Sequence, residues 1–186
     1  MKYRDVVALF QTDHVTDPKS GKRKAVQRYV GPRYRLDEAA RRRGAARLWL
    51  LLALAAAAML TGGFLPNRVT MGNLVAVLYL TCLLPLMYLL LGTVRISRMK
   101  ATIDEFDRCD GLLRVTKSGL GLGVLAAGWL IAGVVQLCTD GLGSLRGQDA
   151  AVLACAAVAS ACGFLAWRTA FALKPEEIPR PDETQA

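Results

Sequence analysis

The sequence predicts an all-α membrane protein: four transmembrane helices, a small N-terminal cytoplasmic β-hairpin, and an amphipathic cytoplasmic helix between the second and third spans. Three observations support this fold class. Of the 186 residues, 53% are hydrophobic and 21% are charged, whereas a typical soluble domain has ~45–50% apolar and ~25% charged residues. Four long runs contain no charged residue, and the basic residues cluster on alternate sides of these runs.

The four uncharged runs are residues 48–65, 74–94, 120–138 and 150–167, and the helix of the last run is expected to extend to residue 173. A helix needs roughly 20 residues to cross a ~30 Å hydrocarbon core, so each run, with a few neighbours at its ends, can span a bilayer. We therefore expect one transmembrane domain over residues 48–173, with a connecting loop at 95–119. This composition excludes a soluble enzyme, a secreted disulfide scaffold and a disordered regulator.

The distribution of lysine and arginine predicts how the chain is oriented. Of the 24 basic residues, 22 lie before the first span, between the second and third spans, or after the fourth; only Arg68 and Arg146 lie in the other two connections. Basic residues are enriched in the cytoplasmic segments that flank membrane spans. We therefore expect a protein of the cytoplasmic membrane with both termini and loop 95–119 in the cytoplasm.

Residues 1–47 form the predicted basic cytoplasmic segment, and its first part has the pattern of a β-hairpin. Two strand-like stretches, residues 6–10 and 25–30, lie on either side of residues 17–21, which read Asp-Pro-Lys-Ser-Gly. These residue types favour a reverse turn, because Asp accepts local backbone hydrogen bonds, Pro fixes φ and Gly tolerates a positive φ. Two strands alone are marginally stable in water, so the hairpin needs a partner surface.

The second part of this segment, residues 36–47, has the pattern of a helix that continues into the first span, with Asp37 and Glu38 at its positive end. Anionic headgroups attract juxtamembrane cations by about 1 kcal/mol each. We therefore expect four arginines to fix the topology and bind anionic membrane lipids: Arg41, Arg42, Arg43 and Arg47. The nearby bilayer explains the basic charge of segment 1–47 better than nucleic acid does, so nucleic acid is not expected as a partner.

The loop between the second and third spans carries apolar residues at helical spacing, namely Ile96, Met99, Ile103 and Phe106, and Gly111 is a candidate helix end. This pattern predicts an amphipathic helix, for which two interpretations stay open. The helix could extend the second span and pack on the hairpin, or it could lie on the membrane surface and bind a partner. The tail, residues 174–186, is expected to be disordered.

The spans contain no Asp, Glu, Lys, Arg or His, although they contain small and polar residues. Small residues four positions apart let membrane helices approach closely, and Ala159 and Gly163 have this spacing. We expect the third and fourth spans to pack on each other or on a second copy through Gly119, Gly123, Ala127, Ala156 and Ser160. Should the protein instead form a transport pathway, its candidate residues are Tyr79, Pro85, Tyr88 and Gln136.

The sequence carries no recognisable catalytic, cofactor or metal site. Its five cysteines form no C-x-x-C pair, and His14 is the single histidine, so we expect no metal ion, no cofactor and no catalysis. We therefore expect a non-catalytic accessory or scaffold subunit that acts through its basic cytoplasmic face. Its partner would be another membrane or cytoplasmic protein, or a second copy. The alternative is a small transporter or channel subunit that forms its pathway as an oligomer.

Overall fold

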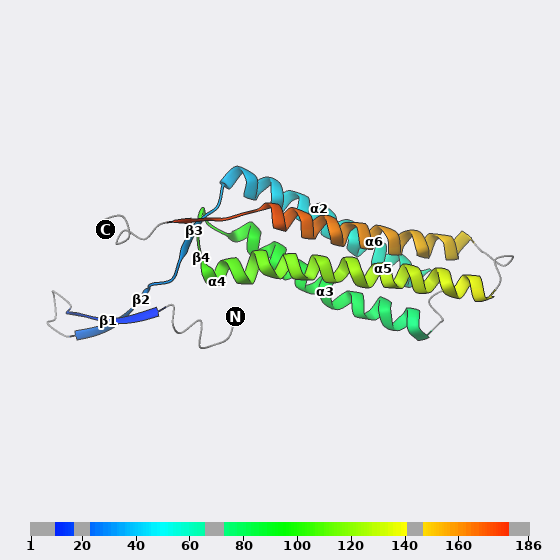
Figure 1. Cartoon of the computed structure of the whole chain (residues 1–186), viewed down its shortest axis with the longest axis horizontal. Coiled ribbons are helices and arrows are strands. Elements are labelled where there is room, and N and C mark those ends of the chain that lie inside the picture. The colour runs from blue at the N-terminus through cyan, green and yellow to red at the C-terminus, as the bar shows by residue number, and fades with distance from the viewer. Residues whose placement is uncertain (1–9, 17–22, 66–72, 141–146, 179–186) are drawn as a thin grey trace.

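The computed structural model describes residues 10–16, 23–65, 73–140 and 147–178 (Figure 1). Most of this part of the chain is helical, and four of its helices are long and apolar enough to cross a membrane. They are α2 (Glu38–Phe64), α3 (Asn73–Arg98), α5 (Arg114–Asp140) and α6 (Gly147–Ala172). Each has 26 or 27 residues, which at 1.5 Å per residue gives a length of about 40 Å. The expectation of a multi-pass membrane protein is thus supported.

The four helices pack side by side as a bundle in which chain neighbours are also neighbours in space (Figure 1). The α5–α6 contact is the most extensive, α2 closes the bundle against α6, and α3 packs mainly on α5. Large side chains from three helices fill the core, including Leu48, Met59, Leu89, Leu122 and Trp129. Only 17% of the most apolar stretch of α3 is buried, compared with 39% in α2 and in α6. The exposed leucines of α3 therefore form much of the outer apolar surface that a membrane would cover.

Helix α2 begins at Glu38, two residues after the predicted start at residue 36, because Asp37 caps it. The Asp37 carboxylate accepts hydrogen bonds from the backbone N–H groups of Ala39 and Ala40, at 3.1 and 3.3 Å. These are two of the donors that the first turn of a helix leaves without a partner. The helix then continues without interruption through the first apolar run to Phe64.

Two small sheets lie at one end of the bundle (Figure 1). In the first, β1 (Phe10–Thr16) and β2 (Arg23–Tyr29) pair antiparallel, with Phe10 opposite Tyr29. The predicted turn at 17–21 lies outside the described residues. In the second, the central strand β3 (Arg33–Arg35) pairs antiparallel with β4 (Thr102–Asp104) on one side and with β5 (Glu176–Ile178) on the other.

The predicted amphipathic helix across 96–111 is wrong. Helix α3 ends at Arg98, residues 102–104 form strand β4, and a new helical stretch begins with α4 (Glu105–Asp107) and the π-helical turn η2 (Arg108–Leu113). Gly111 lies inside this stretch and does not end it. Ile96, Met99 and Ile103 are buried as the pattern suggests, but Phe106 is exposed. Strand β3 supplies backbone partners for 102–104, so Ile103 is buried through the alternation of a strand, not through the period of a helix.

The predicted disorder of the tail is also wrong for part of it. Residues Glu176–Ile178 form β5, which pairs with the edge of β3 that β4 leaves free. Backbone pairing is open to any residue type except proline, so a polar and acidic stretch can add a strand when an edge lies beside it. Residues 179–186 lie outside the described part of the chain.

Candidate functional site

The candidate site is the end of the bundle that carries the sheet β4–β3–β5, which we call the sheet end. Helix α2 and the α4–η2–α5 stretch begin here, and α3 and α6 end here (Figure 1). Every lysine and arginine within the four described long helices lies in the part nearest this end, at positions 41, 42, 43, 47, 95, 98, 114, 117 and 168. Toward the opposite end, the described side chains of these helices include the acidic Asp149. The sheet end is therefore the basic end of the molecule.

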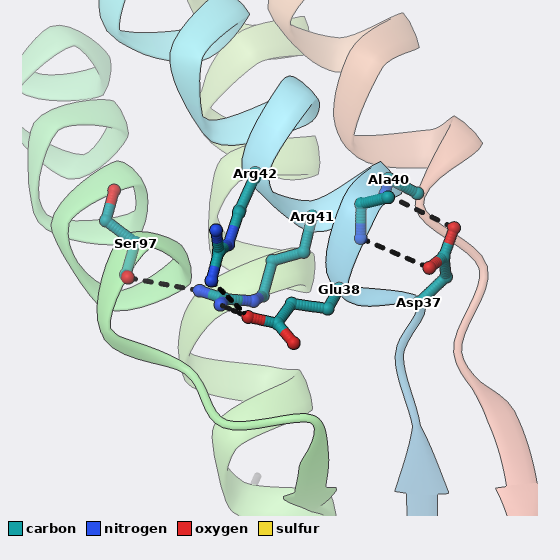
Figure 2. A network of polar contacts seen from close by, with 7 residues as sticks. Asp37, Glu38, Ala40, Arg41, Arg42 and Ser97 are labelled. Atoms are coloured by element: carbon teal, nitrogen blue, oxygen red, sulfur yellow. Dashed lines mark hydrogen bonds and ion pairs between the residues drawn. The ribbon is translucent and has the colours of Figure 1, made fainter.

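The four arginines of α2 do not form a uniform patch. Arg41 turns inward, with its side chain 13% exposed, and donates a hydrogen bond to the backbone carbonyl oxygen of Ser97 at 3.2 Å, as Figure 2 shows. A cation suits the negative C-terminal end of α3. Arg42 is exposed and pairs with Glu38 at 2.6 Å (Figure 2). Arg43 and Arg47 are exposed and line a small depression beside the end of α6.

An ion-pair cluster joins the end of α3 to the start of α5. Arg95 on α3 pairs with Asp107 at 2.5 Å and lies 4.0 Å from Asp110, which also pairs with Arg114. These side chains are partly exposed, and such pairs contribute up to ~1 kcal/mol each. Because the carboxylates of this cluster bind arginines, they are not arranged as a set of ligands for a cation. No group of three or more potential metal-binding side chains occurs among the described residues.

A second cluster lies under the sheet. Tyr34 on β3 is buried, and the guanidinium carbon of Arg108 lies 4.8 Å from the centre of its ring. Arg108 in turn pairs with Glu105 at 3.2 Å. Burial first, and then the neighbouring Glu105 carboxylate, raise the pKa of Tyr34 to about 12, so this phenol stays neutral at physiological pH. The Tyr29 hydroxyl accepts a hydrogen bond from the Glu105 backbone N–H at 3.0 Å, which ties β2 to the start of α4.

Gly119, Gly123 and Ser160 lie in the contact between α5 and α6. The Ser160 hydroxyl donates a hydrogen bond to the Gly123 carbonyl oxygen at 3.0 Å, and Ser160 is buried. A Cβ atom on Gly119 would lie 2.8 Å from the Trp167 backbone nitrogen, and one on Gly163 would lie 2.8 Å from Gly123 Cα. Ala156, on α6, is fully buried, whereas Ala127, on α5, is partly exposed.

The four residues of the alternative pathway do not meet. The Tyr79 hydroxyl donates to the Met59 carbonyl oxygen at 3.0 Å between α2 and α3, and its ring packs edge-on against Trp129. Pro85 and Tyr88 line a groove between α3 and α5 toward the sheet end. Gln136 lines a different, apolar groove near the opposite end of the same two helices. The four side chains thus occupy three separate places.

Several residues of the sheet end could not be found from the sequence. Tyr34 and Arg108 come together from positions 74 apart in the chain, and Arg95 pairs with Asp107, 12 positions away, beyond strand β4. The only local signal was the alternation of exposed arginines around Tyr34 in residues 33–35, which is too short to indicate a strand. No family model, no curated protein and no solved structure matches this chain.

Proposed function

We propose that this chain is a non-catalytic multi-pass membrane protein that acts as an accessory or scaffold subunit, and that the sheet end is the surface it presents to its partner. One observation carries this proposal. Three segments from distant parts of the chain, residues 33–35, 102–104 and 176–178, are brought into one sheet at the basic end of the bundle. A sheet of this kind holds a surface in a fixed shape, which a partner can recognise.

The charge of this surface supports the proposal. Exposed cations project from β3, from the first turns of α2, and from the end of α3 and the residues after it: Arg33, Arg35, Arg42, Arg43, Arg47, Arg98 and Lys100. Buried contacts fix the elements that carry them, because Leu36, Met99 and Ile103 are buried between the sheet and the bundle. An acidic face of another membrane or cytoplasmic protein is the complementary surface, and anionic lipid headgroups would add to the attraction.

The alternative, a transporter or channel subunit, has less support. Its candidate residues occupy three separate places, and within the described bundle the space between α2, α5 and α6 is filled by Trp129 and small side chains. An oligomer would have to build its pathway from the outer faces of α3 and α5, which are mainly apolar.

Purification of the full chain from its own membranes in mild detergent tests the proposal. We expect one protein to co-purify at a fixed ratio with the parent and with a variant that keeps the charge, Arg42→Lys, Arg43→Lys and Arg47→Lys. In the matched charge-free variant, with Gln at the same three positions, we expect the amount of this co-purifying protein to fall at least tenfold. The reason is that three juxtamembrane cations contribute about 1 kcal/mol each to binding an acidic surface.

Two results would contradict the proposal. One is that no protein reaches a fixed ratio with the parent, or that the Gln variant retains it as well as the parent does. The other comes from planar bilayers: we expect the purified chain alone to be silent, whereas a steady conductance that disappears in Gln136→Ala would favour the channel alternative.

A further inference from the structure

A groove of about 480 Å³ runs between α3 and the η2–α5 stretch near the sheet end. Its α3 wall is formed by Leu84, Pro85 and Tyr88, and its opposite wall includes Leu113, Arg114 and Lys117. Leu84 and Tyr88 are 63% and 53% exposed, so the groove opens outward from the bundle and not toward its core. In a bilayer, this opening would face the lipid.

The groove is polar toward the sheet end and apolar farther along the helices. A Cβ atom on Gly121 would lie 3.7 Å from the Pro85 Cβ, so these two residues lie at the same level of the bundle. Lys117 and Arg114 precede Gly121 by four and seven residues, and therefore lie about 6 and 10 Å nearer the sheet end. Leu84 and Pro85 form the deeper, apolar part. An amphiphile with a charged head and an acyl chain has this same division.

The groove also has an uncompensated positive charge. Arg95 and Arg114 are balanced by Asp107 and Asp110 in the ion-pair cluster. Lys117 is exposed and has no ion-pair partner among the described residues. A lone cation beside an apolar helix face costs free energy unless it reaches the interface or finds an anion. One additional negative charge at this place would neutralise Lys117.

We propose that this groove binds one anionic phospholipid from the surrounding leaflet. The phosphodiester group lies between Lys117 and the free edge of Arg114, whose guanidinium is held over the Tyr88 ring with its carbon 5.9 Å from the ring centre. One acyl chain lies along Leu84 and Pro85. A guanidinium has five N–H donors, so Arg114 can bind phosphate while it stays paired with Asp110. The site is distinct from the exposed arginines of α2, which are on a different helix.

Native mass spectrometry of the full chain in neutral detergent, titrated with phosphatidylglycerol and with phosphatidylcholine, tests this site. We expect the parent to retain one phosphatidylglycerol in preference to phosphatidylcholine. Lys117→Gln should weaken phosphatidylglycerol binding about fivefold and leave phosphatidylcholine unchanged, which is the effect of one cation near an anionic headgroup. Lys117→Arg should restore the preference, and Lys174→Gln, an exposed lysine at the same end but outside the groove, should keep it.

A second variant tests the apolar part of the groove. Leu84 is mostly exposed, so Leu84→Trp can fill the space without disturbing the core, and it should weaken binding of both lipids alike. Three results would overturn the proposal: an unchanged lipid preference in Lys117→Gln, an equal loss in Lys174→Gln, or unchanged binding in Leu84→Trp. An excess of glycerol phosphate should not displace the lipid; if it does, the groove binds a soluble anion and the lipid assignment is wrong.

Discussion

Gly163 in α6 lies so close to α5 that a single methyl group should separate the two helices. In Gly163→Ala, the new Cβ would lie 2.8 Å from Gly123 Cα and 2.9 Å from the Gly119 carbonyl oxygen. Carbon atoms prefer separations of about 3.5–4.0 Å, so the helix backbones must move apart by up to about 1 Å. The atoms on the other side are backbone atoms, and no change of rotamer can relieve the contact.

The size of the effect follows from two costs and one gain. Over-packing of this kind costs about 1–3 kcal/mol, and here the upper part of the range applies because the backbone itself must shift. The neighbouring hydrogen bond from Ser160 to Gly123 would also stretch, and hydrogen bonds between membrane helices contribute about 0.6 kcal/mol on average. Alanine favours a helix over glycine by up to about 1 kcal/mol. We expect Gly163→Ala to lower the free energy of unfolding by about 2 kcal/mol.

Gly121 provides a matched control in the partner helix. Its Cβ would meet only Pro85 Cβ at 3.7 Å, which is ordinary contact. We therefore expect Gly121→Ala to leave stability unchanged or to raise it by up to about 1 kcal/mol. Unfolding in mixed micelles with a rising fraction of sodium dodecyl sulfate, followed by tryptophan fluorescence, measures both variants. If the two variants unfold at the same detergent fraction, the close backbone contact between α5 and α6 is not what stabilises this bundle.

Three further predictions address the orientation and the sheet end. With native cysteines removed and single cysteines introduced, a membrane-impermeant thiol reagent should label intact cells at Asn67 and Ser144 but not at Ser20 and Thr184; labelling of either of the latter two contradicts the cytoplasmic assignment. Ile103→Ala should destabilise the protein by about 2–5 kcal/mol, because this side chain is fully buried, whereas Phe106→Ala, at an exposed position, should change stability far less. The raised pKa of Tyr34 means that its contribution to stability is complete below pH 10 and is lost as the pH rises toward about 12. In Tyr34→Phe, the free energy of unfolding should therefore fall less between pH 10 and about 12 than in the parent, as followed by circular dichroism. If the free energy of unfolding depends on pH in the same way in both proteins, Tyr34 does not contribute.

The apolar helices were predictable because their cause is local. Each span must satisfy its own backbone hydrogen bonds inside the bilayer, so about twenty consecutive apolar residues are enough to identify it. The start of α2 was predictable for the same reason, since Asp37 reaches backbone groups only two and three residues away. The basic character of the sheet end followed from counting lysines and arginines, although which side of the membrane it faces stays a prediction.

The partners within the candidate site were less predictable. Arg41 and Arg42 look equivalent in the sequence, yet Arg41 reaches the end of α3 and Arg42 stays exposed beside Glu38, as Figure 2 shows. The difference arises from their positions around α2: successive residues point about 100° apart, and only one of the two directions faces α3. Pattern analysis assigned both to the membrane surface because it contains no information about where the neighbouring helix ends.

The sequence by itself determined that this is a four-helix membrane protein with one basic end, because hydrophobic length and charge distribution act along the chain. Only the tertiary structure decided that residues 33–35, 102–104 and 176–178 form one sheet. Three-residue strands are too short to show a period, and the stability of β3 comes from backbone hydrogen bonds to segments about 70 and about 140 residues farther along the chain. The helices bring these three segments together. Residues 102–104 and 176–178 therefore form strands against β3, and not the amphipathic helix and the disordered tail that their sequences predict.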